Sequence, residues 1–437
     1  MSVASTSGLA SAVRGILPRK QVLDGEDGQR WIGSGGTPGA VAFPASTDEA
    51  ARVLTRASEE GWTVEPVGSG TWLWPGSAGT PPDLVLSASG MVRVVEYDPA
   101  DLTVTAEAGM TLPALASLVT PQHQWLPFDP PGRSHSLGAV AATGVWGPLG
   151  AAWGGPRDLV LGLRAVTGDG RAFSAGGRVV KNVAGFDLVR LLIGSRGALA
   201  FITEVTMRLS SLPEVDHTLV MRGSSLDKLV DGAVRACALS VTPAAVELFE
   251  REVPLGGKSE VALAVRVLGG RERVDAEEAV LRASLASSGE LTRLAPAEAD
   301  ALWREVRHLE EGAELVLRLS LTPARIGELI GLAQTLFSVA GGQEERARMA
   351  VHAGTGVLRL AMPKLRVDSG WDERWAGRLE DLMGALSKRD GTLTVTRAPA
   401  PLRARLKGRE SSPVDGELMS GLKAVFDPAG ILSGGDR

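Results

Sequence analysis

The chain has 437 residues, a formal net charge of −5 and 44% hydrophobic residues. This profile is typical of a globular protein of roughly two to three domains. The acidic balance and the absence of any long Lys/Arg run exclude the basic surface that a nucleic-acid binder needs. One cysteine, Cys237, excludes an internal disulfide and an iron–sulfur cluster held by this chain alone, because such a cluster takes four thiolates.

The start of the chain has no basic segment followed by an apolar run, so no secretory signal is expected. Leu9, Val13, Ile16 and Leu17 instead predict a short amphipathic helix. No stretch approaches the ~18 apolar residues of a membrane span. We therefore expect a cytoplasmic protein that reaches a membrane, if at all, only indirectly through a partner.

The first half of the chain predicts short strands and helices in alternation. After a strand at 41–44, Ser46 and Glu49 form a capping box that opens a helix. Further strands are expected at 63–66, 83–86, 92–97, 102–108 and 201–209, with a helix at 111–118 and a hairpin joining 159–167 to 171–174.

The pattern of predicted elements changes after Pro213. Strands then alternate with longer helices, and glycine becomes rare within these elements. We expect an antiparallel sheet covered by helices on one face. The expected strands are 217–222, 246–249, 261–268, 315–321, 357–360 and 393–396, and the expected helices are 225–238, 273–286, 296–307, 323–337 and 372–388. From Pro401 onward the chain is basic and predicted to be helical.

Glycine carries the functional signal, because 15 of its 54 copies fall between residues 130 and 200 among Leu, Val, Ala and Trp. Such a mixture favours an ordered fold whose backbone approaches a ligand closely. The first glycine segment, 66–72, follows a strand, and its small residues can present N–H groups to phosphate oxygens. Leu73 stands where a dinucleotide fingerprint needs its third glycine, and no Gly-Lys-Ser/Thr occurs. Taken alone, this segment is equally well a plain glycine turn.

Two further segments share this character. Residues 137–148 follow the rigid approach 127–131, and their small side chains leave room for a large flat ligand against the main chain. A tightly packed helix of small residues is the alternative. Residues 194–204 begin with a Gly-Ser-Arg-Gly turn that leads into the strand at 201–209.

In order and spacing, the three segments resemble the FAD-binding domain of the vanillyl-alcohol oxidase family, also called the PCMH-type domain. That family has a Pro-Arg-Gly-Gly-Gly-Thr-like pyrophosphate loop, a Gly-Gly-x-x-Ala-Thr segment along the flavin, and a Gly-Ser-x-Gly-x-Leu-Gly-x-Ile-Thr-Glu segment that 194–204 matches. Residues 426–432 resemble its closing motif. The resemblance is strong over 40–212 and weak in the middle of the chain. Val67, Ser69, Ala139 and Phe186 depart from the family's arginine, glycine, glycine and tyrosine.

The resemblance implies an α+β fold with a two-subdomain PCMH-type FAD-binding domain at 1–212. A cap domain of antiparallel sheet with helices would span 213–399, and a C-terminal return to the first domain 400–437. It implies FAD bound non-covalently; covalent attachment, for which His135 would be the nearest histidine to the second segment, is the less favoured alternative. The residues implied to bind FAD are Val67, Gly68, Ser69, Gly70, Thr71, Trp72, Pro131, Leu137, Gly138, Ala141, Thr143, Gly144, Gly147, Gly197 and Ile202.

Within the family, residues 127–131, 157–162 and 177–187 are most similar to the FAD-binding subunit of glycolate oxidases that accompanies the catalytic one. This implies a subunit that supports oxidation of glycolate, a 2-hydroxy acid, to glyoxylate. Its partners would be a sister FAD-binding catalytic subunit and an iron–sulfur subunit that accepts the electrons. One alternative is a self-sufficient FAD-dependent oxidase or dehydrogenase of another small alcohol or hydroxy acid. Another is a structural subunit with a vestigial pocket.

Catalytic relatives carry a metal-ligating His-x-Gly-Asp-Gly-Asn-x-His run in the cap. The corresponding residues here are 352–359, where His352 remains but Thr355, Val357 and Arg359 replace the Asp, the Asn and the second His. We therefore expect no metal site, assign no catalytic residue, and expect His352 to be a hydrogen-bonded histidine at a strand end. Arg178 and Lys181 are either partners for a carboxylate or solvated surface charges.

Overall fold

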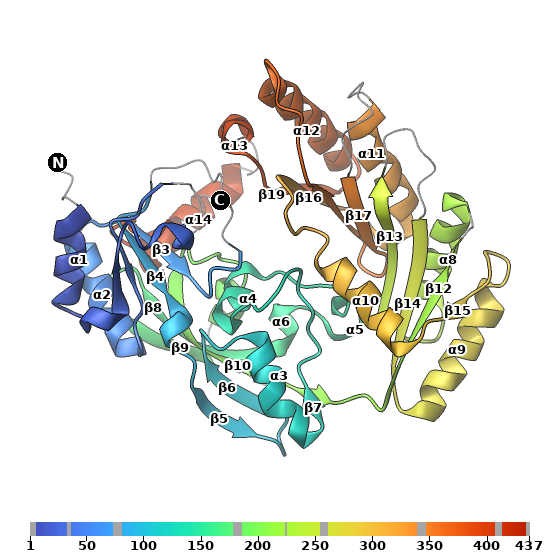
Figure 1. Cartoon of the computed structure of the whole chain (residues 1–437), viewed down its shortest axis with the longest axis horizontal. Helices are drawn as coiled ribbons and strands as arrows, with labels where there is room; N and C mark the ends of the chain where they lie inside the picture. The colour runs from blue at the N-terminus through green and yellow to red at the C-terminus, as the bar shows by residue number, and fades with distance from the viewer. Residues whose placement is uncertain are drawn as a thin grey trace.

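A computed structural model describes residues 6–32, 36–72, 81–177, 186–222, 225–253, 261–338, 347–406 and 413–433. The chain forms two α+β bodies that face each other, with the glycine-rich segments in the first and an extended sheet in the second (Figure 1). None of the described helices has both the length and the apolar character needed to cross a bilayer. The prediction of an α+β fold is confirmed, whereas the domain boundaries at 212 and 399 stay a prediction.

The first body begins with a four-stranded sheet that ends at the first glycine loop. Its order is β1-β2-β4-β3, with β2, β4 and β3 parallel and β1 antiparallel to β2. Ser46 Oγ accepts from the Glu49 N–H at 3.1 Å, which confirms the predicted cap, while the Glu49 carboxylate bonds the N–H of Ala45. The elements are α1 (Thr6–Arg14), β1 (Val22–Asp24), β2 (Ala40–Ala42), α2 (Thr47–Glu60), β3 (Val64–Val67) and β4 (Leu84–Ser87).

A second, fully antiparallel sheet of order β5-β6-β10-β8-β9 completes the first body. Its hairpin β8–β9 is the predicted one, and a single apolar core joins it to the first sheet. The elements are β5 (Val94–Asp98), β6 (Thr103–Glu107), α3 (Leu112–Val119), β7 (Gln124–Trp125), α4 (Leu137–Thr143), α5 (Gly150–Trp153), α6 (Pro156–Leu159), β8 (Val160–Thr167), β9 (Ala172–Gly176), α7 (Leu188–Leu192), β10 (Ala200–Arg208) and β11 (Ser210–Ser211).

The second body, called the cap below, is built on an eight-stranded antiparallel sheet of order β15-β12-β14-β13-β17-β18-β16-β19. The predicted antiparallel pairing is confirmed, although β17 was not among the predicted strands and lies at the centre. The strands are β12 (Val215–Met221), β13 (Ala245–Val253), β14 (Val261–Gly269), β15 (Thr292–Arg293), β16 (Leu315–Ser320), β17 (Ala347–His352), β18 (Val357–Met362) and β19 (Thr392–Arg397).

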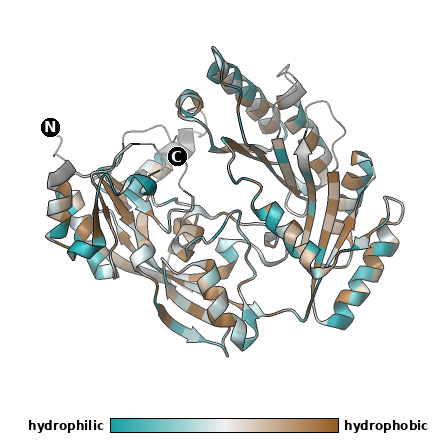
Figure 2. Cartoon of the chain, viewed as in Figure 1, coloured by the Kyte–Doolittle hydropathy of each residue, from teal (hydrophilic) through white to brown (hydrophobic). Residues whose placement is uncertain are grey.

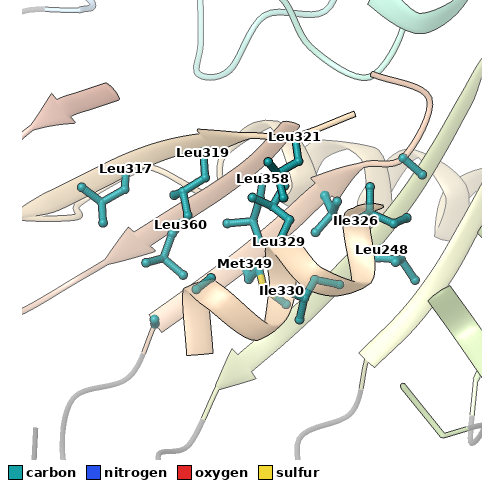
Figure 3. Close-up of a cluster of buried hydrophobic side chains, with 14 of the residues drawn as sticks. Leu248, Leu317, Leu319, Leu321, Ile326, Leu329, Ile330, Met349, Leu358 and Leu360 are labelled. Carbon is teal, nitrogen blue, oxygen red and sulfur yellow. The ribbon is translucent and has the colours of Figure 1, made fainter. Parts of the chain in front are cut away.

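Helices cover both faces of the cap sheet. The outer face carries α8 (Leu226–Ala238), α9 (Arg271–Leu285), α11 (Ile326–Ser338) and α12 (Trp371–Ser387), whose apolar sides turn to the strands (Figure 2). Figure 3 shows this packing, where Ile326, Leu329 and Ile330 of α11 meet leucines of β16 and β18.

Helix α10 (Pro296–Arg307) lies on the opposite face, so the expectation that helices cover only one face is wrong. Trp303 fills the space that Ala245, Ala262 and Ala264 leave on the sheet, and its Nε1 donates to Thr218 Oγ1 at 2.9 Å. Because these strand residues are small, α10 can pack closely on this face of the sheet. The helix lies on the side of the cap that faces the first body (Figure 1).

The chain returns to the first body through α13 (Ala400–Leu406) and α14 (Pro413–Phe426), and Leu432 forms a parallel bridge with Val64 of β3. Asp427 fixes this return. Its side chain is fully buried and accepts from the N–H groups of Ile431 at 3.0 Å and Leu432 at 2.8 Å, and from Lys423 Nζ at 3.0 Å. The end of the chain is thus tied to the strand that precedes the first glycine loop.

We expect Asp427→Ala to destabilise the first body by about 1–3 kcal/mol, because two N–H groups and an ammonium lose their buried acceptor. Chemical denaturation followed by far-ultraviolet circular dichroism measures the change. Glu417→Gln on the same helix is the matched control, since Glu417 is exposed. Equal stabilities for the two variants would show that the return does not depend on this carboxylate.

Candidate functional site

A cavity lies between the two bodies, and the three glycine-rich segments line its wall on the first body. Its empty volume, which includes space open to solvent, is about 1240 Å³. The lining residues are Glu65, Pro66, Val67, Gly68, Gly70, Thr71, Trp72, Ala88, Gly138, Ala139, Ala142, Thr143, Val145, Arg196, Gly197, Ala200, Phe201, Ile202, Glu310, Arg318, Thr396 and Arg403.

The first glycine segment leaves β3 and passes directly over the start of α4. A Cβ at Gly68 would lie 2.2 Å from Ser136 Oγ and 2.9 Å from Ala139 Cβ, so only glycine lets the loop approach the helix this closely. Gly70 has φ +74°, in the left-handed region that favours glycine. Gly68 is therefore required by the close approach to α4, and Gly70 by its backbone conformation. A plain glycine turn would explain only the second requirement.

His135 fastens this loop to the segment that precedes α4. Its Nε2 donates to the carbonyl of Pro131 at 2.6 Å, and its Nδ1 accepts from Thr71 Oγ1 at 2.6 Å. The ring also stacks on Trp72 with 3.7 Å between centroids. Burial lowers the pKa of His135 to about 4, so the ring is neutral at pH 7 and has one donor and one acceptor to offer. Both nitrogens are engaged, which argues against a covalent bond to a flavin here.

The second glycine segment forms the short helix α4, so the packed helix considered as an alternative is present. Ser136 caps it by accepting from the Ala139 N–H, and Gly138 packs where a Cβ would meet Ala108 Cβ at 2.8 Å. One face of the helix still lines the cavity, through Gly138, Ala139, Ala142 and Thr143. The two interpretations are therefore compatible.

The third segment closes the cavity behind the first loop. Gly197 has φ +81°, and a Cβ there would lie 2.9 Å from Pro66 Cβ. The chain then enters β10, whose Phe201 and Ile202 line the same wall. Residues 194–204, although distant in the sequence, therefore lie against the start of the first glycine loop.

Nine of the fifteen residues implied to bind FAD line this cavity, and six do not. Leu137 and Ala141 turn into the core, and Gly144 ends α4 in the left-handed conformation against Gly194. Gly147 lies against the Asp129 carbonyl, where a Cβ would be at 1.9 Å. Ser69 Oγ donates to Ser134 O, and Pro131 accepts from His135 and Trp72. These six support the wall from behind, and contact of any of the fifteen with the cofactor stays a prediction.

The cap supplies the opposite wall through Glu310, Arg318, Thr396 and Arg403, none of which the sequence singled out. Arg318 is half-buried on β16, and its Nε has no hydrogen-bond partner among the described residues. The Glu310 carboxylate lies 3.4 Å from Arg359 Nη1. The cap wall therefore offers two guanidinium groups, those of Arg318 and Arg403, and one carboxylate, that of Glu310.

Behind this wall lies a buried polar cluster around His352. His352 ends β17 and hydrogen-bonds Glu247 through Nδ1, which confirms the predicted strand-end histidine. Burial raises the pKa of Glu247 well above its usual range and lowers that of His352 well below its own, and Arg359 lowers the pKa of His352 further. Arg359, which replaces the second histidine of the family's metal run, is fully buried and donates to Val306 O at 2.8 Å.

Among the residues that the structure describes, no group of three or more His, Cys, Asp and Glu is arranged to hold a metal ion. Arg178 and Lys181, which the sequence analysis singled out, lie outside the described residues.

The His135 clamp predicts a specific pH dependence. A folded-state pKa of about 4, below the ordinary value of ~6.5, means that the unfolded chain binds more protons between these values. The stability linked to His135 is therefore present above pH ~6.5 and lost as the pH falls toward ~4. His135→Gln keeps one donor and one acceptor without titrating in this range. We expect the slope of unfolding free energy against pH to be smaller in the variant by up to ~1.4 kcal/mol per pH unit. Denaturant titrations from pH 7 to 4.5 measure it, and parallel slopes would contradict it.

Residues 38–176 match the FAD binding domain family, and residues 212–436 match the C-terminal domain of FAD linked oxidases. The chain superimposes on p-cresol methylhydroxylase with a TM-score of 0.74 at 15% identity, covering 100% of this chain and 98% of that one. The PCMH-type fold predicted from the sequence is thereby confirmed.

Curated relatives include a Bacillus subtilis protein, glycolate oxidase subunit GlcD, 28% identical over 91% of this chain and 88% of its own length. A D-2-hydroxyglutarate dehydrogenase of Xanthomonas citri pv. viticola is 26% identical over 93% and 90%. Glycolate oxidase subunit GlcE of Escherichia coli is 34% identical, but over 41% of this chain and 52% of its own. The specific resemblance to the accompanying FAD-binding subunit, of which GlcE is an example, is therefore supported only in part.

The cavity fits FAD, because its glycine positions bring bare backbone where any Cβ would collide, and the family models that match on either side of it are both those of FAD proteins. Since the C-terminal-domain match spans 212–436, more than half of its 437 residues, this chain belongs to the FAD linked oxidases and is an FAD-dependent oxidoreductase.

Proposed function

We propose that this chain is an FAD-carrying subunit of a glycolate oxidase-like assembly and that a small 2-hydroxy acid is oxidised to the 2-oxo acid at its interdomain cavity. The observation that supports this proposal is that the two walls of the cavity differ in chemical character. The first body presents bare glycine backbone, and the cap presents Arg318 and Glu310. FAD, when bound, supplies the redox chemistry, and the protein supplies position and polarity.

Residues 67–72 would hold the pyrophosphate through backbone N–H groups, since a loop of glycines and small polar residues can form an anion nest. Residues 138–143 would lie along the flavin ring, because the Gly138, Ala139 and Ala142 side of α4 is nearly free of side-chain bulk. We expect the attachment to be non-covalent.

Arg318 is the group best suited to the carboxylate of a hydroxy acid. Its guanidinium reaches the cavity from the cap, and its buried Nε lacks a partner among the described residues. An ionised carboxylate can supply the missing acceptor, and guanidinium–carboxylate pairs are strong and directional. Curated relatives named for glycolate oxidase and D-2-hydroxyglutarate dehydrogenase agree with this substrate class.

The role within an assembly rests on the same relatives, two of which are named as glycolate oxidase subunits. A sister FAD-binding subunit and an iron–sulfur subunit as electron acceptor are the partners we propose. A chain with one cysteine cannot hold such a cluster by itself. Membrane contact would then be indirect, through the partners.

The second candidate is a self-sufficient oxidase or dehydrogenase. The observation that favours it is that this chain's own cavity contains both a guanidinium for a carboxylate and a carboxylate near it. The two candidates differ in whether a partner is needed for flavin reduction.

We expect the purified chain to be yellow and glycolate or D-lactate to bleach the flavin without oxygen. Visible absorbance near the flavin maximum is the measurement. Bleaching by the isolated chain supports the self-sufficient enzyme, and bleaching only with the partner subunits supports the assembly. A colourless protein that takes up no added FAD would contradict both.

The loop–helix contact gives a second prediction. Gly68→Ala would place a methyl group 2.2 Å from Ser136 Oγ, which is already engaged as the cap of α4. We expect the loop to be displaced and most of the FAD to be lost on gel filtration. Gly377→Ala on α12 is the matched control, because nothing lies within 4 Å of its added methyl group. The ratio of flavin to protein absorbance decides, and full retention in Gly68→Ala would refute our placement of the pyrophosphate loop.

A further inference from the structure

Two carboxylates are found among the described residues that line the cavity, and they lie at different ends of it. Glu65 belongs to β3, at the pyrophosphate-type loop, and accepts from Ser433 Oγ at 2.7 Å. Glu310 follows α10 and reaches the cavity from the cap, on the same wall as Arg318. Only Glu310 is therefore placed on the side that also offers an anchor for a substrate carboxylate.

Arginines from the two strands that flank β16 hold Glu310 in place. Arg359 of β18 is fully buried and points Nη1 at Glu310 Oε1 at 3.4 Å, while its Nη2 donates to the carbonyl of Val306 on α10. Arg397 of β19 donates to the backbone carbonyl of Glu310 at 3.3 Å. The second carboxylate oxygen, Oε2, accepts no hydrogen bond from the described residues, so one oxygen is oriented and the other is available.

We propose that Glu310 is the catalytic base that removes the hydroxyl proton of the substrate while Arg318 holds its carboxylate. This inference rests on the proposed function, oxidation of a 2-hydroxy acid at this cavity. Carboxyl and hydroxyl groups of such a substrate are on adjacent carbons, which suits an anchor and a base on one wall. Arg359 acts on the substrate only through Glu310 and is a positioning residue.

The substrate O–H bond breaks, and its proton passes to Glu310. The C2–H bond breaks with its electron pair as a carbon–oxygen double bond forms, which leaves the 2-oxo acid. FAD, when bound, would supply the two-electron oxidant that this loss of hydride requires. The protonated Glu310 then returns its proton to water that enters when product leaves.

The test uses the FAD-loaded chain, with its partners present if bleaching needs them. We expect Glu310→Gln to slow anaerobic bleaching by glycolate or D-lactate by roughly 10²–10⁴-fold, the usual loss when a general base is removed. Oxalate, which carries the carboxylate but cannot be oxidised, serves as a binding probe monitored by calorimetry. Its dissociation constant should stay the same or fall in Glu310→Gln. In Arg318→Met it should rise roughly ten- to hundredfold.

Glu311→Gln is the matched control, because Glu311 is the next residue, is exposed, and pairs with Arg133 at 3.2 Å outside the cavity lining. It should bleach at the wild-type rate. Wild-type bleaching together with an equally fast Glu310→Gln variant would overturn the base assignment. So would a Glu310→Gln variant that loses FAD or oxalate binding, since that outcome indicates a structural role. If no 2-hydroxy acid bleaches the wild-type protein in any assembly, the proposed function itself fails.

Discussion

The imidazole of His135 is the contact on which the cofactor side of the molecule depends. A loop made of glycines and small polar residues has little side-chain surface with which to hold its own shape. His135 supplies what is missing by bonding Thr71, by stacking on Trp72, and by bonding back to Pro131. The clamp works only while the ring is neutral, because Nδ1 must accept a hydrogen bond. Burial enforces that neutrality, and so one desolvated ring keeps backbone donors ordered for a ligand.

The cap brings the charged side chains of Glu310, Arg318 and Arg359 into the interior of the protein. Seating α10 on the inner face of the sheet places the turn after it, with Glu310, next to strands that carry Arg318 and Arg359. Arg359 donates to the Val306 carbonyl and lies against the Glu310 carboxylate through its terminal nitrogens, while its Nε has no partner among the described residues. Behind it, burial raises the pKa of Glu247 and lowers that of His352. In this chain the fully buried guanidinium of Arg359 stands at the sequence position that corresponds to the second histidine of the family's metal run.

The cofactor side was largely predictable from the sequence, because glycine positions report local backbone requirements. The capping box at Ser46 and the three glycine segments are short-range patterns, and each determines the backbone structure of its own residues. The cap wall was not predictable in this way. Glu310 lies in an ordinary-looking turn after a helix and Arg318 in an ordinary-looking strand, and only the pairing of β16, β18 and β19 brings them to one surface. The inner position of α10 depends on Ala245, Ala262 and Ala264, which are far from this helix in the sequence. An alanine within a strand does not by itself indicate that a helix packs against it.

The C-terminal return has a consequence for how the protein is made. Ser433 bonds Glu65 across a separation of 368 residues, and Leu432 pairs with Val64 immediately before the first glycine loop. Contacts of such long sequence separation form late, since they must wait for distant parts of the chain. During synthesis the strand that carries the loop therefore lacks its contact with Leu432 until the whole cap and residues 427–433 have been made. The cofactor site is thus completed late, so a nascent chain or a variant without residues 427–433 presents an unfinished pocket.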